Sequence, residues 1–290
     1  MRDAGIAPVD PGEIAADGAL HRFNVEGDKP GRRNGWCVLH VDTRGAGGAF
    51  GSWRSGASHT WHSGGGRITA SERKRLAEAI EQARCQREAE TQRRHETTQA
   101  RAQRLWAQAG PASADHPYLA RKRVLPHGIR QSGELLLVPM HDIDNTLWNL
   151  QTIAADGQKR FLSGGRKRGL MFVIGSITGA AHVDTGDTLG DIRGLLIAEG
   201  YATAATLYEC TDTPTVVAFD CGNLEPVASA LRSKYPDVRV TLCADNDVQT
   251  PGNPGMAKAT AAARAVGGFV AVPPNGHNDF NDAAVAEATP

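Results

Sequence analysis

The sequence predicts an α/β protein: a parallel sheet flanked by helices, preceded by a mixed α+β basic region and by a long polar helix. Short apolar runs at 195–198, 215–219 and 238–244 alternate with helical stretches, which is the pattern of βαβ units. Carboxylates directly follow the first and the last of these runs. Basic residues are concentrated in the first two thirds of the chain. These observations predict one catalytic region near the C-terminus.

Composition limits the protein classes that fit the chain. Lys plus Arg equals Asp plus Glu at 32 each, so overall charge does not indicate a nucleic-acid binder. The apolar content is 40%, without a run of membrane-spanning length or a signal-like N-terminus, so we expect a bacterial cytoplasmic protein with no membrane partner. The five cysteines form no CxxC pair, which argues against a zinc-binding module and for reduced thiols.

The first predicted domain, 1–70, is a small β-containing N-terminal module with short strands at 38–41 and 49–53. Basic and aromatic residues alternate along it, and those that we expect to bind DNA are Arg32, Arg33, Trp36 and Trp53. Basic side chains beside exposed aromatic rings hold single strands through phosphate contacts and base stacking. The alternative is that the tryptophans fill a small β core and the arginines only solvate it.

The second predicted domain, 71–110, is a polar linker helix. Residues 71–104 contain nine Lys or Arg and six Glu but few large apolar residues. Such a helix either bridges between domains or is held by ion pairs four residues apart, for example Arg84 with Glu88. A nucleic-acid-binding arm is the functional alternative.

The third predicted domain, 111–190, is a basic α+β subdomain. Strands at 134–140 and 147–153, joined by a polar turn, predict an antiparallel hairpin. A short helix carries Arg121 and Lys122. Five basic residues then flank two glycines, and they are Lys159, Arg160, Arg166, Lys167 and Arg168. Backbone amides of such a loop can approach phosphates, so we expect nucleotide or DNA binding here, although an ordinary hairpin turn is the alternative.

The fourth predicted domain, 191–290, contains the parallel sheet. Ligands gather at the carboxyl ends of parallel strands, which places Glu199, Asp245 and Asp247 at one edge. These carboxylates repel one another unless a cation lies between them, and oxygen ligands suit Mg²⁺ or Mn²⁺. Asp245 and Asp247 could share a metal ion, while Glu199 takes a proton or holds a second metal. The alternative is an ordinary strand-to-helix turn in which Asp caps a helix.

A fourth parallel strand at 269–272 leads to Asp279 and Asp282, three residues apart at the same edge. We expect both to complete the metal site. The alternative is that Asp279 is the N-cap of a terminal helix that begins at Phe280.

Three motifs resemble the TOPRIM domain of primases from plasmids, phages and mobile elements. They are Ile197-Ala198-Glu199-Gly200-Tyr201, Ala218-Phe219-Asp220-Cys221-Gly222-Asn223-Leu224 and Cys243-Ala244-Asp245-Asn246-Asp247. The resemblance implies a TOPRIM fold for 191–290, acid/base work for Glu199 and metal binding by Asp245 and Asp247. It also implies that the preceding basic subdomain guides template and nucleotide. One residue departs from the pattern: cellular primases often have an Asp four residues after the Glu, where this chain has Thr203.

The expected function is that of a DNA-dependent primase serving a mobile genetic element. It would make short RNA primers on a single-stranded DNA template from NTPs, by metal-assisted nucleotidyl transfer with Mg²⁺ or Mn²⁺. A replicative helicase or an element-encoded replication protein is a further candidate partner. The sequence has no GxxxxGK[ST] loop, so we expect no fused ATPase. The alternatives are a TOPRIM nuclease and a catalytically idle single-strand-binding accessory protein.

Overall fold

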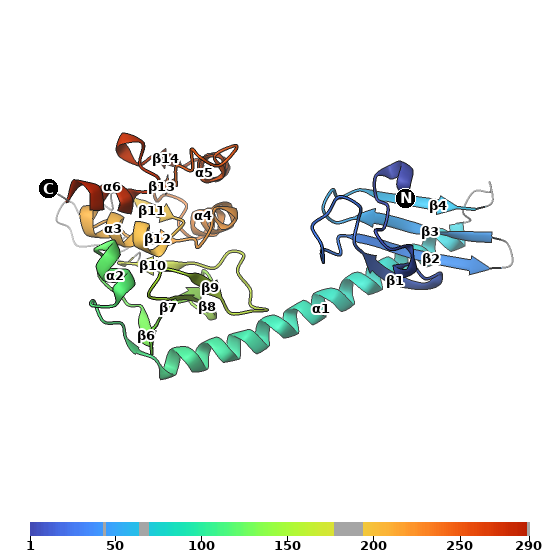
Figure 1. Ribbon diagram of the computed structural model, residues 1–290, viewed down its shortest axis with the longest axis horizontal. Coiled ribbons are helices and arrows are strands. Elements are labelled where there is room, and N and C mark those ends of the chain that lie inside the picture. Colours follow the sequence, from blue (N-terminus) through green and yellow to red (C-terminus); the bar gives the residue numbers. More distant parts are fainter. Residues whose placement is uncertain (43–44, 64–69, 177–193, 289–290) are drawn as a thin grey trace. The chain divides into compact units, whose positions relative to one another are not determined.

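The computed structural model describes residues 1–42, 45–63, 70–176 and 194–288. They form two compact units, Met1–Thr91 and Gln92–Pro290, each of which is described by itself (Figure 1). The predicted boundary between 111–190 and 191–290 lies outside the described residues. No described helix is long and apolar enough to cross a membrane.

The N-terminal unit is built on a four-stranded antiparallel sheet in which each strand pairs with the next along the chain. The strands are β1 (Asp17–Phe23), β2 (Gly35–Asp42), β3 (Gly45–Ser52) and β4 (Ser58–His62). Short 3-10 helices at Arg2–Ala4 and Pro11–Glu13 precede them. A small apolar core is formed by Ile6, Phe23, Val25, Cys37 and Phe50. The strands predicted at 38–41 and 49–53 correspond to β2 and β3.

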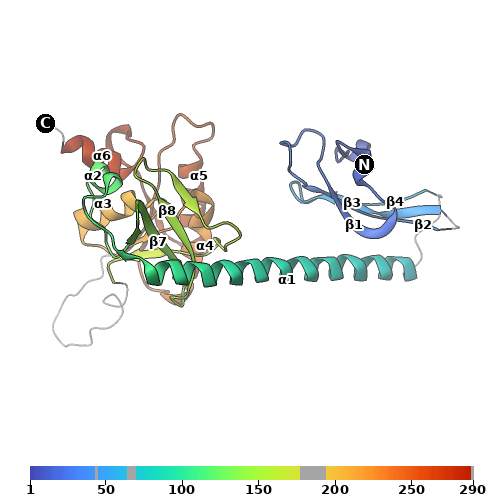
Figure 2. The same cartoon turned by 60° about the horizontal axis from the view of Figure 1, so that its bottom comes forward.

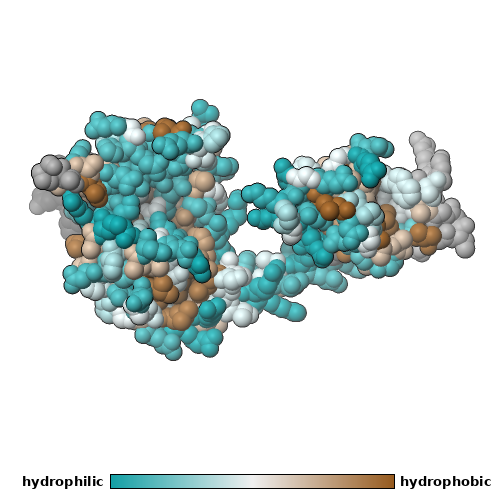
Figure 3. Space-filling view, in the orientation of Figure 1, coloured by the Kyte–Doolittle hydropathy of each residue, from teal (hydrophilic) through white to brown (hydrophobic). Residues whose placement is uncertain are grey.

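The polar helix is α1 (Ala70–Gln108), which is 39 residues long. The predicted pair is present, because Arg84 Nε donates to Glu88 Oε1 at 2.9 Å. In the view of Figure 3 the side chains along α1 are mostly hydrophilic or neutral. The end of the helix differs, since Ala102, Leu105 and Trp106 pack on apolar residues of the neighbouring sheet.

That neighbouring sheet is antiparallel and has five strands, each of which pairs with the next one along the chain. Its strands are β5 (Gly110–Pro111), β6 (Arg130–Ser132), β7 (Leu135–His141), β8 (Leu147–Ile153) and β9 (Lys159–Phe161). The short helix α2 (Pro117–Lys122) lies between β5 and β6 in the chain. The predicted hairpin is the β7–β8 pair, beside which the end of α1 runs in Figure 2.

The second sheet of this unit has the strand order β10-β12-β11-β13-β14. Its strands are β10 (Phe172–Ile174), β11 (Leu195–Ala198), β12 (Thr215–Val217), β13 (Val240–Cys243) and β14 (Phe269–Ala271). The last four are parallel, as predicted. The edge strand β10 differs from the prediction, because it pairs antiparallel with β12 although its residues fall in the predicted basic subdomain.

Helices cover both faces of this sheet (Figure 1). They are α3 (Tyr201–Thr211), α4 (Leu224–Lys234), α5 (Pro254–Val266) and α6 (Phe280–Glu287). Helices α4 and α5 share one apolar core with the sheet. Helix α3 shares another, larger core that also contains Leu136, Val138 and Met140 of β7. The antiparallel sheet and the parallel sheet therefore share one apolar core, in addition to the core that each has on its other side.

We expect Gly48→Ala to destabilise the N-terminal unit selectively. A Cβ at Gly48 would lie 2.0 Å from the backbone oxygen of Val38 across the β2–β3 pair. Overpacking of this kind costs about 1–3 kcal/mol of unfolding free energy. Calorimetry should show an earlier transition for one unit, whereas the control Gly110→Ala, with nothing within 4 Å, should melt like wild type. Equal shifts for both units would contradict the selective effect on the N-terminal unit, and no shift would contradict the predicted clash at Gly48.

Candidate active site

The carboxyl ends of three neighbouring strands bring acidic residues together. Ala198 of β11 lies in register with Val217 of β12 on one side and with Cys243 of β13 on the other. Glu199 follows β11 directly, Asp220 follows the end of β12, and Asp245 follows the end of β13. The edge is held closely, since the Ala218 N–H donates to the Ala198 oxygen at 2.8 Å. The predicted convergence of Glu199 and Asp245 at one sheet edge is therefore present.

We call the residues at this edge the carboxylate cluster; its members are Glu199, Asp220, Asp245, Asp247 and Asp279. Burial raises the pKa of Glu199 to about 8, and the negative charges of Asp245, Asp247 and Asp220 act in the same direction. Burial likewise raises the pKa of Asp245 to about 7, with further contributions from Asp279 and Asp247. Both shifts show that the folded chain disfavours ionisation of these two carboxyl groups.

Two oxygens of the cluster fit a cation. Glu199 Oε1 and Asp245 Oδ1 are buried and have no hydrogen-bond partner within the part of the chain that the structure describes. Buried acceptors without partners are costly, and hard divalent cations are the natural partners for carboxylate oxygens. Among the described residues, no three His, Cys, Asp or Glu side chains are close enough together to hold a metal ion. The cluster therefore offers oxygen ligands without a closed shell.

Asp279 and Asp282 have structural partners at this edge. The Asp279 side chain caps α6, accepting from the Asp282 N–H at 2.8 Å, and Asp282 forms an ion pair with Lys122 at 3.0 Å. The neighbouring chain is tied to the cluster, because the Asn246 N–H donates to the Asn278 oxygen at 2.7 Å. The capping alternative is thus present in the structure, and metal binding by Asp279 and Asp282 stays a prediction.

Two lysines reach the cluster from the antiparallel sheet and the segment after it. A Cβ at Gly200 would lie 3.4 Å from Lys159 Nζ, which places this amine beside the Glu199 motif. Although the residue as a whole is exposed, burial of its ammonium lowers the pKa of Lys159, against the attraction of Asp245. Lys167 Nζ lies 2.5 Å from Asp220 Oδ2 and 5.3 Å from the centre of the Phe161 ring. Positive charge therefore faces the carboxylates.

The other predicted basic residues of this unit lie differently. Arg160 is exposed and follows Lys159 in β9, where successive side chains point to opposite faces. The Arg166 guanidinium lies 5.2 Å from the centre of the Trp148 ring, and Arg168 is exposed. Arg121 donates to the Ala155 oxygen at 3.0 Å. These contacts do not join them to the carboxylate cluster, and their predicted binding role is untested.

The N-terminal residues belong to the other unit. The Trp36 and Trp53 ring centres are 6.1 Å apart, and neither ring is part of the buried apolar core. Guanidinium groups of Arg22 and Arg87 lie 4.9 Å and 4.8 Å from the Trp53 ring. Arg33 pairs with Glu13 at 2.8 Å, and Arg32 is exposed. Neither tryptophan belongs to the buried apolar core of this unit, and DNA binding by these residues stays a prediction.

Asp220 was missing from the predicted site residues. The rule that identifies Glu199 and Asp245 also applies to Asp220, because Asp220 follows the carboxyl end of a buried strand of the parallel sheet. Thr203, the departure from the primase pattern, is buried in α3 with 3% of its surface exposed. It supplies no negative charge to the cluster.

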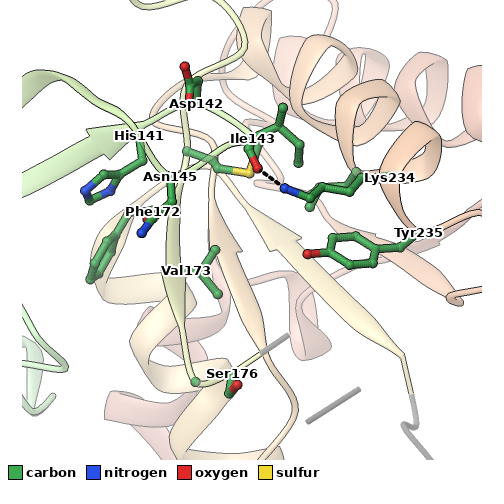
Figure 4. A pocket seen from close by; sticks show the side chains of 12 residues that line it. His141, Asp142, Ile143, Asn145, Phe172, Val173, Ser176, Lys234 and Tyr235 are labelled. Carbon is green, nitrogen blue, oxygen red and sulfur yellow. Dashed lines mark hydrogen bonds between the residues drawn. The ribbon is translucent and has the colours of Figure 1, made fainter. Parts of the chain in front are cut away.

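A separate pocket of about 480 Å³ lies beside β10 and the end of α4 (Figure 4). Its charged groups are engaged within the protein. Lys234 Nζ donates to the Ile143 oxygen at 2.5 Å, and the Asp142 carboxylate accepts from Trp148 Nε1 at 2.7 Å. Burial lowers the pKa of His141, which favours the neutral imidazole. The pocket does not include any residue of the carboxylate cluster.

We expect the stability of the metal-free protein to fall as pH rises from about 4 to about 8. Glu199 and Asp245 have folded-state pKa values of about 8 and about 7, above their ordinary values, so the folded chain binds more protons than the unfolded chain in this window. Melting temperatures measured in a chelator should show the decline, and Asp245→Asn should flatten it. An Asp245→Asn variant with the wild-type pH dependence would contradict the raised pKa.

We expect Asp279→Ala to reduce the unfolding free energy by about 1 kcal/mol, because the N-cap bond of α6 is lost. Denaturant titration measures this loss. If Asp279 also binds metal, Asp279→Asn should raise the metal concentration needed for half-maximal activity. An unshifted metal requirement would leave Asp279 as a cap alone.

Comparisons with known proteins agree with this geometry. Residues 194–289 match the family described as "Toprim domain". Two curated proteins of Escherichia coli, both named DNA primase TraC, are 38% identical to the chain over 267 and 265 residues. Each match covers 89% of this chain but 24% of one relative and 18% of the other, so the chain spans a quarter or less of their length.

Among solved structures, the primase fragment of the bacteriophage T7 primase-helicase protein is similar with a TM-score of 0.39 at 14% identity. That similarity covers 56% of this chain and 63% of the other. The sequence comparisons therefore show that residues 194–289 resemble the Toprim domain family and that most of the chain is similar to part of the proteins named DNA primase TraC.

Proposed function

We propose that the chain is a DNA-dependent primase that makes short RNA primers on single-stranded DNA for a mobile genetic element. The observation that carries the proposal is the pair of half-buried carboxyl groups, Glu199 and Asp245, at adjacent strand ends of the sheet that matches the Toprim domain. Each has a raised pKa and one oxygen without a partner among the described residues. The 38% identity to proteins named DNA primase TraC supports the choice of reaction.

The cluster suits metal-assisted nucleotidyl transfer. Asp245 and Asp247 would hold Mg²⁺ or Mn²⁺, with Glu199 adjacent. The bound ion supplies positive charge that neutralises the phosphates of an incoming NTP. Glu199 has a pKa of about 8, close to the range that suits a general base working near neutral pH. It would accept the proton of the attacking hydroxyl group.

The lysines beside the cluster would bind the phosphates. Lys159 lies against the Glu199 motif, and Lys167 is paired with Asp220. Burial lowers the pKa of the Lys159 ammonium, and the negative charge of a bound triphosphate would favour its protonated form. Lys159 is therefore suited to bind a triphosphate. Lys122, which acts electrostatically on Lys159, would extend this positive path to α2. A nuclease site needs the carboxylates but not this nucleotide path.

The partners follow from the reaction. The template would be single-stranded DNA and the substrates NTPs, in the cytoplasm of a bacterium. In the N-terminal unit, Arg32 and the paired Trp36 and Trp53 would add phosphate contacts and a stacking surface. A replicative helicase or an element-encoded replication protein is a further proposed partner.

The test is incubation of the full chain with single-stranded DNA, NTPs and Mn²⁺. We expect short RNA products from the wild type and none from Asp245→Asn or Asp247→Asn, because each removes a negative charge that would face the metal. Glu199→Gln should lower the rate of synthesis more than DNA affinity.

The control is Asp237→Asn, an exposed aspartate that precedes β13 at the opposite edge of the sheet, and it should leave synthesis unchanged. Degradation of the DNA would indicate the nuclease instead. Binding without synthesis or degradation would indicate an idle accessory protein. Primer synthesis by the Asp245→Asn, Asp247→Asn double variant would overturn the metal assignment.

A further inference from the structure

The basic segment, residues 163–170, is anchored by three buried polar side chains from distant parts of the fold. Thr98 Oγ1 of α1 donates to the Ser163 oxygen at 3.2 Å. Asn149 Nδ2 of β8 donates to the Arg166 oxygen at 2.9 Å. Asn223, which follows β12, holds the other end. The exposed fractions of the three anchors are 6%, 0% and 2% in that order. These bonds hold the backbone of the segment near both of its ends and in its middle.

Both the oxygen and the nitrogen of the Asn223 side-chain amide form hydrogen bonds to the backbone. Its Oδ1 accepts from the Gly169 N–H at 2.7 Å. Its Nδ2 donates to the Leu170 oxygen at 2.9 Å and to the Ala218 oxygen at 2.8 Å. One side chain thus joins the end of the basic segment to the end of β12. No other side chain of this size presents one acceptor and two donors in this geometry.

Each of the two segments that Asn223 joins carries a charged residue of the site. On one side Lys167 precedes Gly169 by two residues, and on the other Asp220 follows Ala218 by two residues. The two charged side chains meet at 2.5 Å. The intervening Phe219 has φ of 73°, a left-handed conformation that a bulky residue adopts only when its surroundings impose it. The Asn223 bond to the Ala218 oxygen is one of the contacts that holds this turn.

We infer that Asn223 is a positioning residue that fixes Lys167 opposite Asp220 in the carboxylate cluster. This inference rests on the proposed function for the use made of Lys167. Asn223 itself touches neither metal nor substrate in this account. It acts through the backbone, because loss of its amide releases the end of the basic segment and the strained turn together.

The experiment compares Asn223→Ala with Thr215→Val in the full chain. Thr215 is fully buried in β12, the strand that precedes Asn223, at the end away from the cluster, and its Oγ1 donates to the Thr213 oxygen at 2.9 Å. Hydrogen exchange by mass spectrometry reports the opening of residues 163–170. Affinity for a single-stranded oligodeoxynucleotide is measured for Asn223→Ala, Lys167→Gln and the double variant. Asn223→Ser, which keeps one hydrogen-bonding group, serves if the alanine variant does not fold.

Asn223→Ala should speed exchange in 163–170 by about tenfold or more relative to Thr215→Val, since the Gly169 N–H and two buried backbone oxygens lose their partner. Asn223→Ala and Lys167→Gln should each weaken binding, and the double variant should bind no more weakly than Lys167→Gln. Exchange equal to that of Thr215→Val, or additive binding losses, would overturn the inference. A wild type that bound no oligonucleotide would count against the proposed function, and the exchange comparison would then decide the inference by itself.

Discussion

The cost of placing half-buried carboxyl groups beside one another at one sheet edge is the constraint on which the rest of this structure depends. Parallel pairing places the ends of β11, β12 and β13 side by side, and each end is followed by an acidic residue. Burial makes this arrangement costly, as the raised pKa values of Glu199 and Asp245 show. The sheet tolerates the cost because apolar cores on both of its faces fix the strands. Burial, and to a smaller extent the neighbouring negative charges, therefore makes ionisation of these carboxyl groups unfavourable unless positive charge lies beside them.

The antiparallel sheet, which lies outside the region that matches the Toprim domain, brings positive charge to these carboxylates. Residues of β7 share an apolar core with α3, so packing holds the two sheets together. That packing carries Lys159 to the Glu199 motif and the basic segment to Asp220. Asn223 then ties the basic segment to β12. The lysine ammonium groups and the carboxylates are thus positioned by contacts between parts of the chain that are far apart in the sequence.

The parts of this arrangement that sequence predicts are those with local signals. The strand 195–198 matches β11, and the carboxyl-end rule places Glu199 and Asp245 together, because buried strands and the residues that follow them are continuous in the chain. The three-residue strand β10 carries too little pattern to reveal its partner, so its residues were grouped with the basic subdomain. The bonds of Asn223 to Gly169 and Leu170 join residues more than fifty positions apart and leave no periodic signal. The capping bond of Asp279 competes with its predicted ligand role, and the sequence fits both.

The most direct test of the central claim is equilibrium binding of Mn²⁺ to the full chain, followed by electron paramagnetic resonance without nucleotide or DNA. If the carboxylate cluster is poised for a cation, the wild type should bind Mn²⁺ and Asp245→Asn should weaken binding by about tenfold or more, because a charged oxygen ligand is lost. Asp237→Asn, at the opposite edge of the sheet, should bind as the wild type does. Equal Mn²⁺ affinity for the wild type and Asp245→Asn would contradict the account.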